Sequence, residues 1–316
     1  MRISLFFLVV SLGVASFGMS QQQPTPASNL AIWPDLAPDE TSRATGNALA
    51  PPRKPSKPPI TRIENIRKPT LDVFPAENPS GVGILILPGG GFNYVVPDLE
   101  GSEAVPMLNK LGISVFVLRY RTKQDKNDSG WKHALQDAQR AMKLLRVNSK
   151  KWNLDKDKIG LLGFSAGGQV AARLLTDNGN LSYVEIDEVD KISHRPDFSI
   201  LIYPWNMYAA KTDSLLPELK PGQEIFKTVP PTFIVHTNDD RSSSLGSVLF
   251  YAELRKASVD AELHVYRNGG HGYGTRTRPD SNIGTWPDRL VEWLTNCKLA
   301  IVADDGSAVP TLHNRH

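Results

Sequence analysis

The stretch IGLLGFSAGG at residues 159–168 is the part of the chain that decides its fold. Its first six residues are apolar or glycine, which is typical of a strand buried on both faces of a parallel sheet, and a helical pattern follows at residues 169–174. A serine between such a strand and such a helix lies on a sharp turn that holds its hydroxyl clear of the chain. The stretch therefore predicts a nucleophilic serine, Ser165. The structural alternative is a tight turn whose serine only caps the helix.

Apolar runs of the same kind recur along the chain, at residues 82–87, 113–118, 198–203 and 232–237. Amphipathic patterns with helical spacing lie between them, at residues 131–145 and 245–252. Shorter elements complete the pattern, with strands expected at residues 60–66, 70–74 and 262–266 and a helix at residues 286–297. This alternation predicts an α/β domain built on a mostly parallel sheet with helices on both faces.

The first twenty residues have the order of a secretory signal peptide. Arg2 precedes an apolar run at residues 3–17, and small residues up to Ser20 come before a polar stretch. The run is shorter than the about 20 apolar residues that cross a bilayer. We therefore expect residues 1–20 to be a signal peptide, and the protein to be secreted or periplasmic without a stable membrane anchor.

Composition divides the remaining chain into three segments. Residues 21–59 are rich in proline and are expected to be extended and solvated, because proline disrupts the interior of helices and sheets. Residues 60–300 show no break in composition and are interpreted as one catalytic domain, and residues 301–316 as a C-terminal tail.

Charge and cysteine content exclude several classes of protein. The 36 Lys and Arg residues against 33 Asp and Glu residues leave a net charge of +3, so no broad basic surface for nucleic acid is expected. The single cysteine, Cys297, excludes an internal disulfide framework and a cysteine-rich metal site. No two histidines have the spacing of metal ligands, so we expect neither a metal nor another cofactor.

A glycine-rich loop, PGGGF at residues 88–92, follows the first apolar run. Three glycines after a strand allow the backbone to approach a ligand and to direct N–H groups at it, as in sites that stabilise an oxyanion. A phosphate-binding loop is the rival interpretation, but no Gly-Lys-Ser/Thr follows. A flexible turn without a function is the other alternative.

A nucleophilic serine needs a base, and the base needs an acid that orients it. Asp239 and Asp240 follow the apolar run at residues 232–237, and His271 lies in the loop GGHGYG that follows the last predicted strand. The chain order is serine, aspartate, histidine, and each residue comes just after a strand. His236 lies inside an apolar run and is interpreted as a buried supporting group.

At these residues the chain resembles the α/β-hydrolase esterases. More narrowly, it resembles the acetyl-xylan-esterase and feruloyl-esterase-like group that is related to hormone-sensitive-lipase-type esterases. The resemblance covers residues 60–294 and implies the α/β-hydrolase fold. It also implies Ser165 as nucleophile, His271 as base and an aspartate of the pair as acid, with Asp240 preferred because the acid of the family is the second of the two.

The resemblance implies oxyanion donors at the backbone N–H groups of Gly90, Gly91 and Ala166. The chain departs from the family pattern at Pro88 and Gln169, where histidines are common. It departs again at Arg241, where proline usually follows the acid, and this departure bears on the choice between the two aspartates.

The resemblance and the predicted export suggest a substrate. They imply an ester hydrolase that removes short acyl groups, acetyl above all, from carbohydrate esters such as acetylated xylan. The segment at residues 204–229 is expected to form a short cap, with Trp205 on one wall of the site and Tyr94 on the other. The alternatives are a general short-chain carboxylesterase or lipase-like enzyme, a serine peptidase of the same fold, and a binding relative without catalysis.

Overall fold

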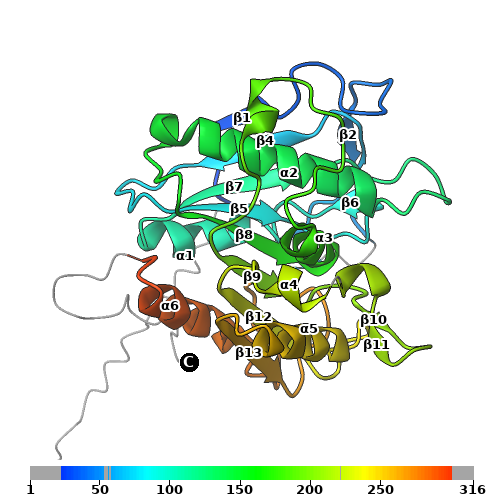
Figure 1. The fold of residues 1–316 in the computed structure, drawn as a ribbon, viewed down its shortest axis with the longest axis vertical. Coiled ribbons are helices and arrows are strands. Elements are labelled where there is room, and N and C mark those ends of the chain that lie inside the picture. Colours follow the sequence, from blue (N-terminus) through cyan, green and yellow to red (C-terminus); the bar gives the residue numbers. More distant parts are fainter. Residues whose placement is uncertain (1–22, 53–55, 57, 221, 301–316) are drawn as a thin grey trace, which may run out of the picture.

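The computed structural model describes residues 23–52, 56, 58–220 and 222–300 (Figure 1). Eight strands form its central sheet in the order β1-β4-β7-β5-β8-β9-β12-β13. Their bounds are β1 Ser28–Ala31, β4 Thr70–Phe74, β7 Ser114–Arg119, β5 Gly83–Leu87, β8 Ile159–Phe164, β9 Ser199–Ile202, β12 Thr232–Thr237 and β13 Ala261–Tyr266. The six strands from β7 to β13 pair in parallel, whereas β4 pairs antiparallel with both β7 and β1. The predicted mostly parallel sheet is therefore confirmed.

The sheet is buried on both faces by helices. The helices are α1 Val105–Lys110, α2 Trp131–Val147, α3 Ser165–Thr176, α4 Gln223–Phe226, α5 Leu245–Lys256 and α6 Trp286–Asn296. Short 3₁₀ turns lie at Ser102–Ala104, Ser149–Trp152, Glu188–Lys191, Pro217–Leu219 and Ile283–Thr285. No helix in the described ranges is long and apolar enough to cross a membrane.

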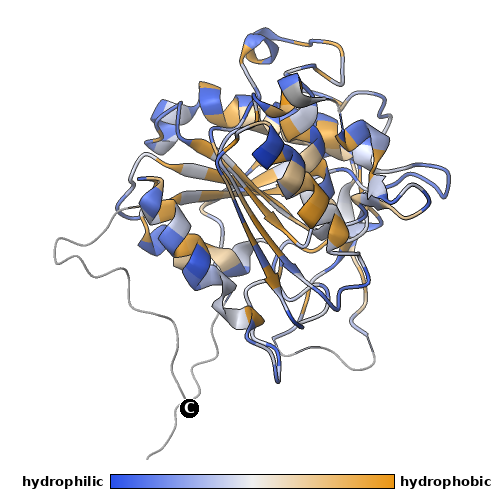
Figure 2. Cartoon of the chain, turned by 60° about the horizontal axis from the view of Figure 1, so that its bottom comes forward, coloured by the Kyte–Doolittle hydropathy of each residue, from blue (hydrophilic) through white to orange (hydrophobic). Residues whose placement is uncertain are grey.

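Alternate residues of each central strand enter two separate hydrophobic cores. In β5, Leu85 and Leu87 pack in the core that contains residues of α2, α3 and α5, whereas Ile84 and Ile86 pack in the core that contains residues of α1 and α6. Figure 2 shows the hydrophobic colour concentrated in these central strands. Because both faces of such a strand are buried, its sequence does not alternate between apolar and polar residues. This explains the continuous apolar runs in the sequence.

The N-terminal segment differs from its prediction. Residues 28–31 form β1 at the edge of the central sheet, and β2 (Thr45–Ala48) pairs with β3 (Ile63–Ile66). The expectation that residues 21–59 are solvated is wrong at residues 28–33, because residues 27–33 contain no proline and can pair their backbone along an edge strand. Ile32 and Trp33 are buried directly after β1. The predicted signal peptide at residues 1–20 and the predicted tail at residues 301–316 lie outside the described residues.

A second, three-stranded sheet lies beside the carboxyl ends of the central strands. It has the order β2-β3-β6, with β6 at Tyr94–Val95, and β3 is four residues long rather than the seven predicted at residues 60–66. The glycine-rich loop after β5 leads directly into β6. In open α/β sheets, ligands bind outside the carboxyl ends of the strands. The loops after β5, β8, β12 and β13 are therefore the place to look for a site.

Candidate active site

Ser165 lies on the sharp turn between β8 and α3. Its backbone has a φ of +50°, which is strained for a residue with a side chain. The turn is tight because α3 starts against the preceding strands: a Cβ at Gly167 would lie 2.0 Å from the carbonyl oxygen of Leu87. Glycine at this position therefore permits the close approach that sets the serine hydroxyl at the edge of the sheet.

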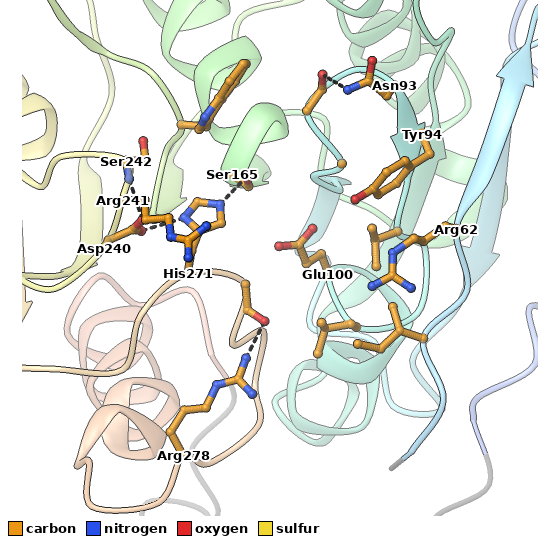
Figure 3. Close-up of a pocket in the computed structure, with 17 residues that line it drawn as sticks. Arg62, Asn93, Tyr94, Glu100, Ser165, Asp240, Arg241, Ser242, His271 and Arg278 are labelled. Atoms are coloured by element: carbon orange, nitrogen blue, oxygen red, sulfur yellow. Dashed lines mark hydrogen bonds and ion pairs between the residues drawn. The ribbon is translucent and has the colours of Figure 1, made fainter. Parts of the chain in front are cut away.

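The side chains of Ser165, His271 and Asp240 form a continuous hydrogen-bonded chain (Figure 3). Ser165 Oγ lies 2.7 Å from His271 Nε2, and His271 Nδ1 lies 2.6 Å from Asp240 Oδ2. Because an ionised carboxylate only accepts hydrogen bonds, Nδ1 carries the proton and Nε2 is free to accept the proton of the serine hydroxyl. The three side chains are thus arranged for proton transfer away from Ser165.

The two neighbouring aspartates have different partners. Asp240 is buried and contacts the imidazole, whereas Asp239 is exposed and accepts hydrogen bonds from the backbone N–H groups of Gly269 and Gly270. These bonds hold the pKa of Asp239 below its ordinary value, the one from Gly270 most strongly. Asp239 therefore fixes the loop that carries His271, and Asp240 fixes the ring itself.

Asp240 is held in its ionised form by a cluster of donors. Burial alone would raise its pKa, but hydrogen bonds from His236 and His271 outweigh burial and lower the pKa to about 2. His236 Nε2 lies 3.1 Å from Asp240 Oδ2, and the backbone N–H of Ser242 donates to Oδ1 at 2.7 Å. His236 Nδ1 contacts the Ser247 hydroxyl, 2.8 Å away. His236 is thus a buried supporting residue, as its place in an apolar strand suggested.

The three predicted oxyanion donors lie around Ser165. Gly90 and Gly91 line the cavity beside it, and Ala166 follows it at the start of α3, where the first N–H groups have no acceptor within the helix. Gly90 has a φ of +131°, and a Cβ there would lie 2.0 Å from the carbonyl oxygen of Tyr94. Only glycine therefore allows this loop to fold back beside the serine.

A cavity of about 660 Å³ opens above Ser165 and His271, which is within the usual range for small-molecule sites. Tyr94 and Trp205 both line it, as expected. The rest of the expected cap at residues 204–229 lies elsewhere. Its hairpin, β10 (Tyr208–Ala209) and β11 (Ser214–Leu215), packs against α5. Among the residues of this segment that the structure describes, only Trp205 lines the cavity.

Two residues that sequence reasoning missed connect the glycine-rich loop after β5 to the histidine. Glu100 is buried, accepts a hydrogen bond from the N–H of Gly89 at 3.0 Å, and accepts another from the Tyr203 hydroxyl at 2.9 Å. Burial raises the pKa of the Glu100 carboxyl, although these two hydrogen bonds oppose the rise. The Tyr203 ring packs edge-on against the His271 ring, with centroids 4.9 Å apart. A lone glutamate after a loop gives no sequence signal that distinguishes it from a surface residue.

The cavity also contains three arginines that the sequence analysis did not place in the site. Arg62, Arg241 and Arg278 all line it, on different sides of the serine (Figure 3). Among the residues that the structure describes, no group of three or more His, Cys, Asp or Glu side chains is placed to hold a metal ion.

A mostly parallel sheet with a serine on the strand–helix turn after β8, and an aspartate and a histidine after β12 and β13, defines the α/β-hydrolase class. Within this class, residues 71–202 match the family model described as BD-FAE. The esterase group that the sequence resembles is therefore confirmed as the group to which the chain is related.

The chain is also similar to two curated proteins and to a solved structure. The chain is 29% identical to an acetylxylan esterase of Xylanibacter ruminicola over 77% of its own length and 50% of that protein. It is 30% identical to endo-1,4-beta-xylanase B of Butyrivibrio fibrisolvens over 60% of its own length and 32% of that protein. The chain thus spans half or less of these relatives. An acetyl ester-xyloside bifunctional hydrolase from Caldicellulosiruptor lactoaceticus superposes with a TM-score of 0.68 at 28% identity, covering 88% of this chain and 98% of that one.

Proposed function

We propose that the protein is a serine carboxylic-ester hydrolase that removes short acyl groups, acetyl above all, from carbohydrate esters such as acetylated xylan. The observation that carries this proposal is the hydrogen-bonded chain from Ser165 through His271 to Asp240 at the base of a cavity. This arrangement provides a nucleophile, a base and an acid that orients the base.

The reaction proceeds in two steps. Ser165 Oγ attacks the acyl carbon while His271 Nε2 takes the hydroxyl proton, and the imidazolium then gives this proton to the leaving alcohol oxygen as the carbon–oxygen bond breaks. Water next attacks the acyl-serine and transfers its proton to Nε2. The acid is released when this proton returns to Ser165 Oγ. Asp240, ionised because its pKa is about 2, stabilises the imidazolium in both steps.

The negative charge on the carbonyl oxygen is stabilised by backbone donors. We assign this role to the N–H groups of Gly90, Gly91 and Ala166. The N–H of the neighbouring Gly89 is engaged by Glu100, which anchors the loop at its base. A donor that is fixed before the reaction stabilises the transition state without reorganisation, and the loss of one costs about 10²–10³ in rate.

The substrate assignment is supported by the relatives and by the cavity walls. The curated relatives are named acetylxylan esterase and endo-1,4-beta-xylanase B. Tyr94 and Trp205 present aromatic rings to the cavity, and such rings pack well against the apolar faces of sugars. A polysaccharide substrate is found outside the cell, which agrees with the secretory pattern of residues 1–20.

The test compares Ser165→Ala with the wild-type protein on an aryl acetate and on acetylated xylan. We expect kcat for both substrates to fall by roughly 10⁶-fold, because loss of the nucleophile removes the whole triad mechanism. Ser193→Ala, an exposed serine outside the cavity, serves as the matched control and should retain wild-type rates. Retained hydrolysis by Ser165→Ala would overturn the proposal, and a panel of feruloyl sugars, triglycerides and peptides would reveal a different substrate class.

A further inference from the structure

Three guanidinium groups line the cavity, and they come from three separate parts of the chain. Arg62 precedes β3, Arg241 lies in the loop between β12 and α5, and Arg278 lies in the loop between β13 and α6. Figure 3 shows them on different sides of the opening, with Arg241 beside His271 and Arg62 below Tyr94. A net charge of only +3 over 316 residues makes three arginines around one cavity a local concentration of charge.

The two carboxylates that line the same cavity are occupied by protein donors. Glu100 binds the Gly89 N–H with one oxygen and the Tyr203 hydroxyl with the other. Asp240 binds His271 with one oxygen and the Ser242 N–H with the other. Among the described residues, the ion pairs of Asp240 are both with imidazoles, and neither carboxylate forms an ion pair with an arginine of the cavity.

The arginines have few partners of their own. Arg62 lies over the Tyr94 ring, with Cζ 5.8 Å from its centroid, and Arg278 donates to the Gly272 carbonyl at 2.8 Å. Within the part of the chain that the structure describes, neither Arg62 nor Arg241 forms an ion pair with a carboxylate. Arg62 is only half-buried and Arg241 is exposed, so both can reach a bound molecule.

We propose that this cavity selects esters that carry a carboxylate near the scissile bond, as in an acylated saccharide that contains a uronic acid. The proposal rests on the ester-hydrolase function and names its substrate class. A planar guanidinium binds a carboxylate through two parallel hydrogen bonds, which is the geometry that distinguishes arginine from lysine. The aromatic walls would hold the sugar ring while Arg62 or Arg241, according to the side of the serine on which the acidic group lies, binds that group.

The experiment compares matched charged and neutral esters. The first pair, 4-acetoxybenzoate and 4-acetoxybenzamide, places the charge on the alcohol part, and a second pair, an aryl hemisuccinate and the aryl butyrate, places it on the acyl part. We expect kcat/KM for the charged member of one pair to exceed that of its neutral partner by about 10- to 100-fold, the range of a hydrogen bond to a charged group. The pair that shows the preference identifies the part of the substrate that the arginines contact.

Variants and salt distinguish charge recognition from a structural effect. In the double variant Arg62→Gln/Arg241→Gln the charged-to-neutral ratio should fall to about one, and in the wild type it should fall with added salt because salt screens exposed charges. Arg289→Gln, a surface arginine of α6 paired with Glu292, is the matched control and should keep the wild-type ratio. A ratio at or below one in both pairs, or a ratio unchanged in the double variant, overturns the proposal.

A binding measurement keeps the inference separate from the ester-hydrolase function. Calorimetry on Ser165→Ala with an acetylated uronic-acid oligosaccharide and its neutral, carboxyl-reduced counterpart should show tighter binding of the acidic sugar. Equal affinities would overturn the inference even if neutral esters are hydrolysed. Tighter binding of the acidic sugar by a protein without ester hydrolysis would instead overturn the proposed function alone.

Discussion

Two buried aspartates near the carboxyl ends of two parallel strands of the central sheet, β7 and β12, show how the same group serves different purposes. Asp137 on α2 is fully buried and binds Arg121, which follows β7, as well as the Trp33 indole N–H at 2.8 Å. Asp240 after β12 has an equally buried side chain, but it binds two imidazoles. A guanidinium stays charged at any accessible pH, whereas an imidazole can gain and lose a proton.

The surroundings of the two carboxylates follow from these partners. The Asp137 cluster is covered by the N-terminal segment, where Arg121 Nη1 also donates to the carbonyl of Pro38 at 2.6 Å. The Asp240 cluster opens to the cavity through His271, whose side chain is 30% exposed. The ion pair of Asp137 with Arg121 is permanent and closed off from solvent, so it stabilises the fold. Asp240 contacts a ring that can titrate and that lines a cavity, so it can support catalysis.

The largest effect that would test this contrast is the loss of charge at Asp240. Asp240→Asn should lower kcat by about 10⁴-fold, because an amide no longer fixes the proton-bearing tautomer of His271. The matched variant Asp239→Asn alters only the hydrogen bonds to Gly269 and Gly270 and should cost far less. Steady-state kinetics on an aryl acetate measures both, and the reverse ranking would assign the acid to Asp239.

The serine and the histidine of the candidate site could be selected from sequence because strand patterns place them. A buried apolar run fixes where a parallel strand ends, and the carboxyl ends of parallel strands meet at one edge. Ser165 and His271 each follow such a run, so their proximity required no knowledge of side-chain packing. The preference for Asp240 over Asp239 came from the family resemblance, because strand patterns cannot separate two adjacent residues whose side chains point in different directions. In the structure only Asp240 reaches the imidazole.

Other features could not be predicted because long-range packing creates them. Glu100 and Tyr203 are separated by 103 residues, and their hydrogen bond forms only when the segment after β6 meets the end of β9. Arg62 reaches the cavity because β3 pairs with β6, and nothing in the local sequence indicates that pairing. Strand β1 was missed because the prolines around it dominate the composition, although the four residues that pair with β4 contain none.

The loss of charge at Asp137 should have the opposite consequence, a large effect on folding with intact chemistry. Asp137→Asn leaves the buried Arg121 guanidinium without its main counterion, and breaking a buried pair in this way costs about 3–5 kcal/mol in the free energy of unfolding. Urea denaturation measures this change, and kcat per folded molecule should stay at the wild-type value. The exposed Asp157, exchanged for Asn as a control, should leave the stability close to wild type.

A result in which Asp137→Asn lowers kcat while leaving the stability unchanged would contradict the contrast. It would mean that the α2 cluster acts on the site, although the residues that line the cavity include neither Asp137 nor Arg121.

The smallest expected effect concerns the dependence of stability on pH. The pKa of Asp240 is about 2 in the folded protein, below its ordinary value of 3.8, so the folded state favours the ionised form. The corresponding stabilisation, about 2 kcal/mol, is fully present above about pH 4 and is lost as the pH falls through 2. In Asp240→Asn the side-chain amide at this position does not titrate between pH 2 and pH 5. The difference in unfolding free energy between wild type and Asp240→Asn, measured in urea, should therefore shrink by about 2 kcal/mol from pH 5 to pH 2. A difference that stays constant over this range would show that His236 and His271 do not hold Asp240 in its charged form.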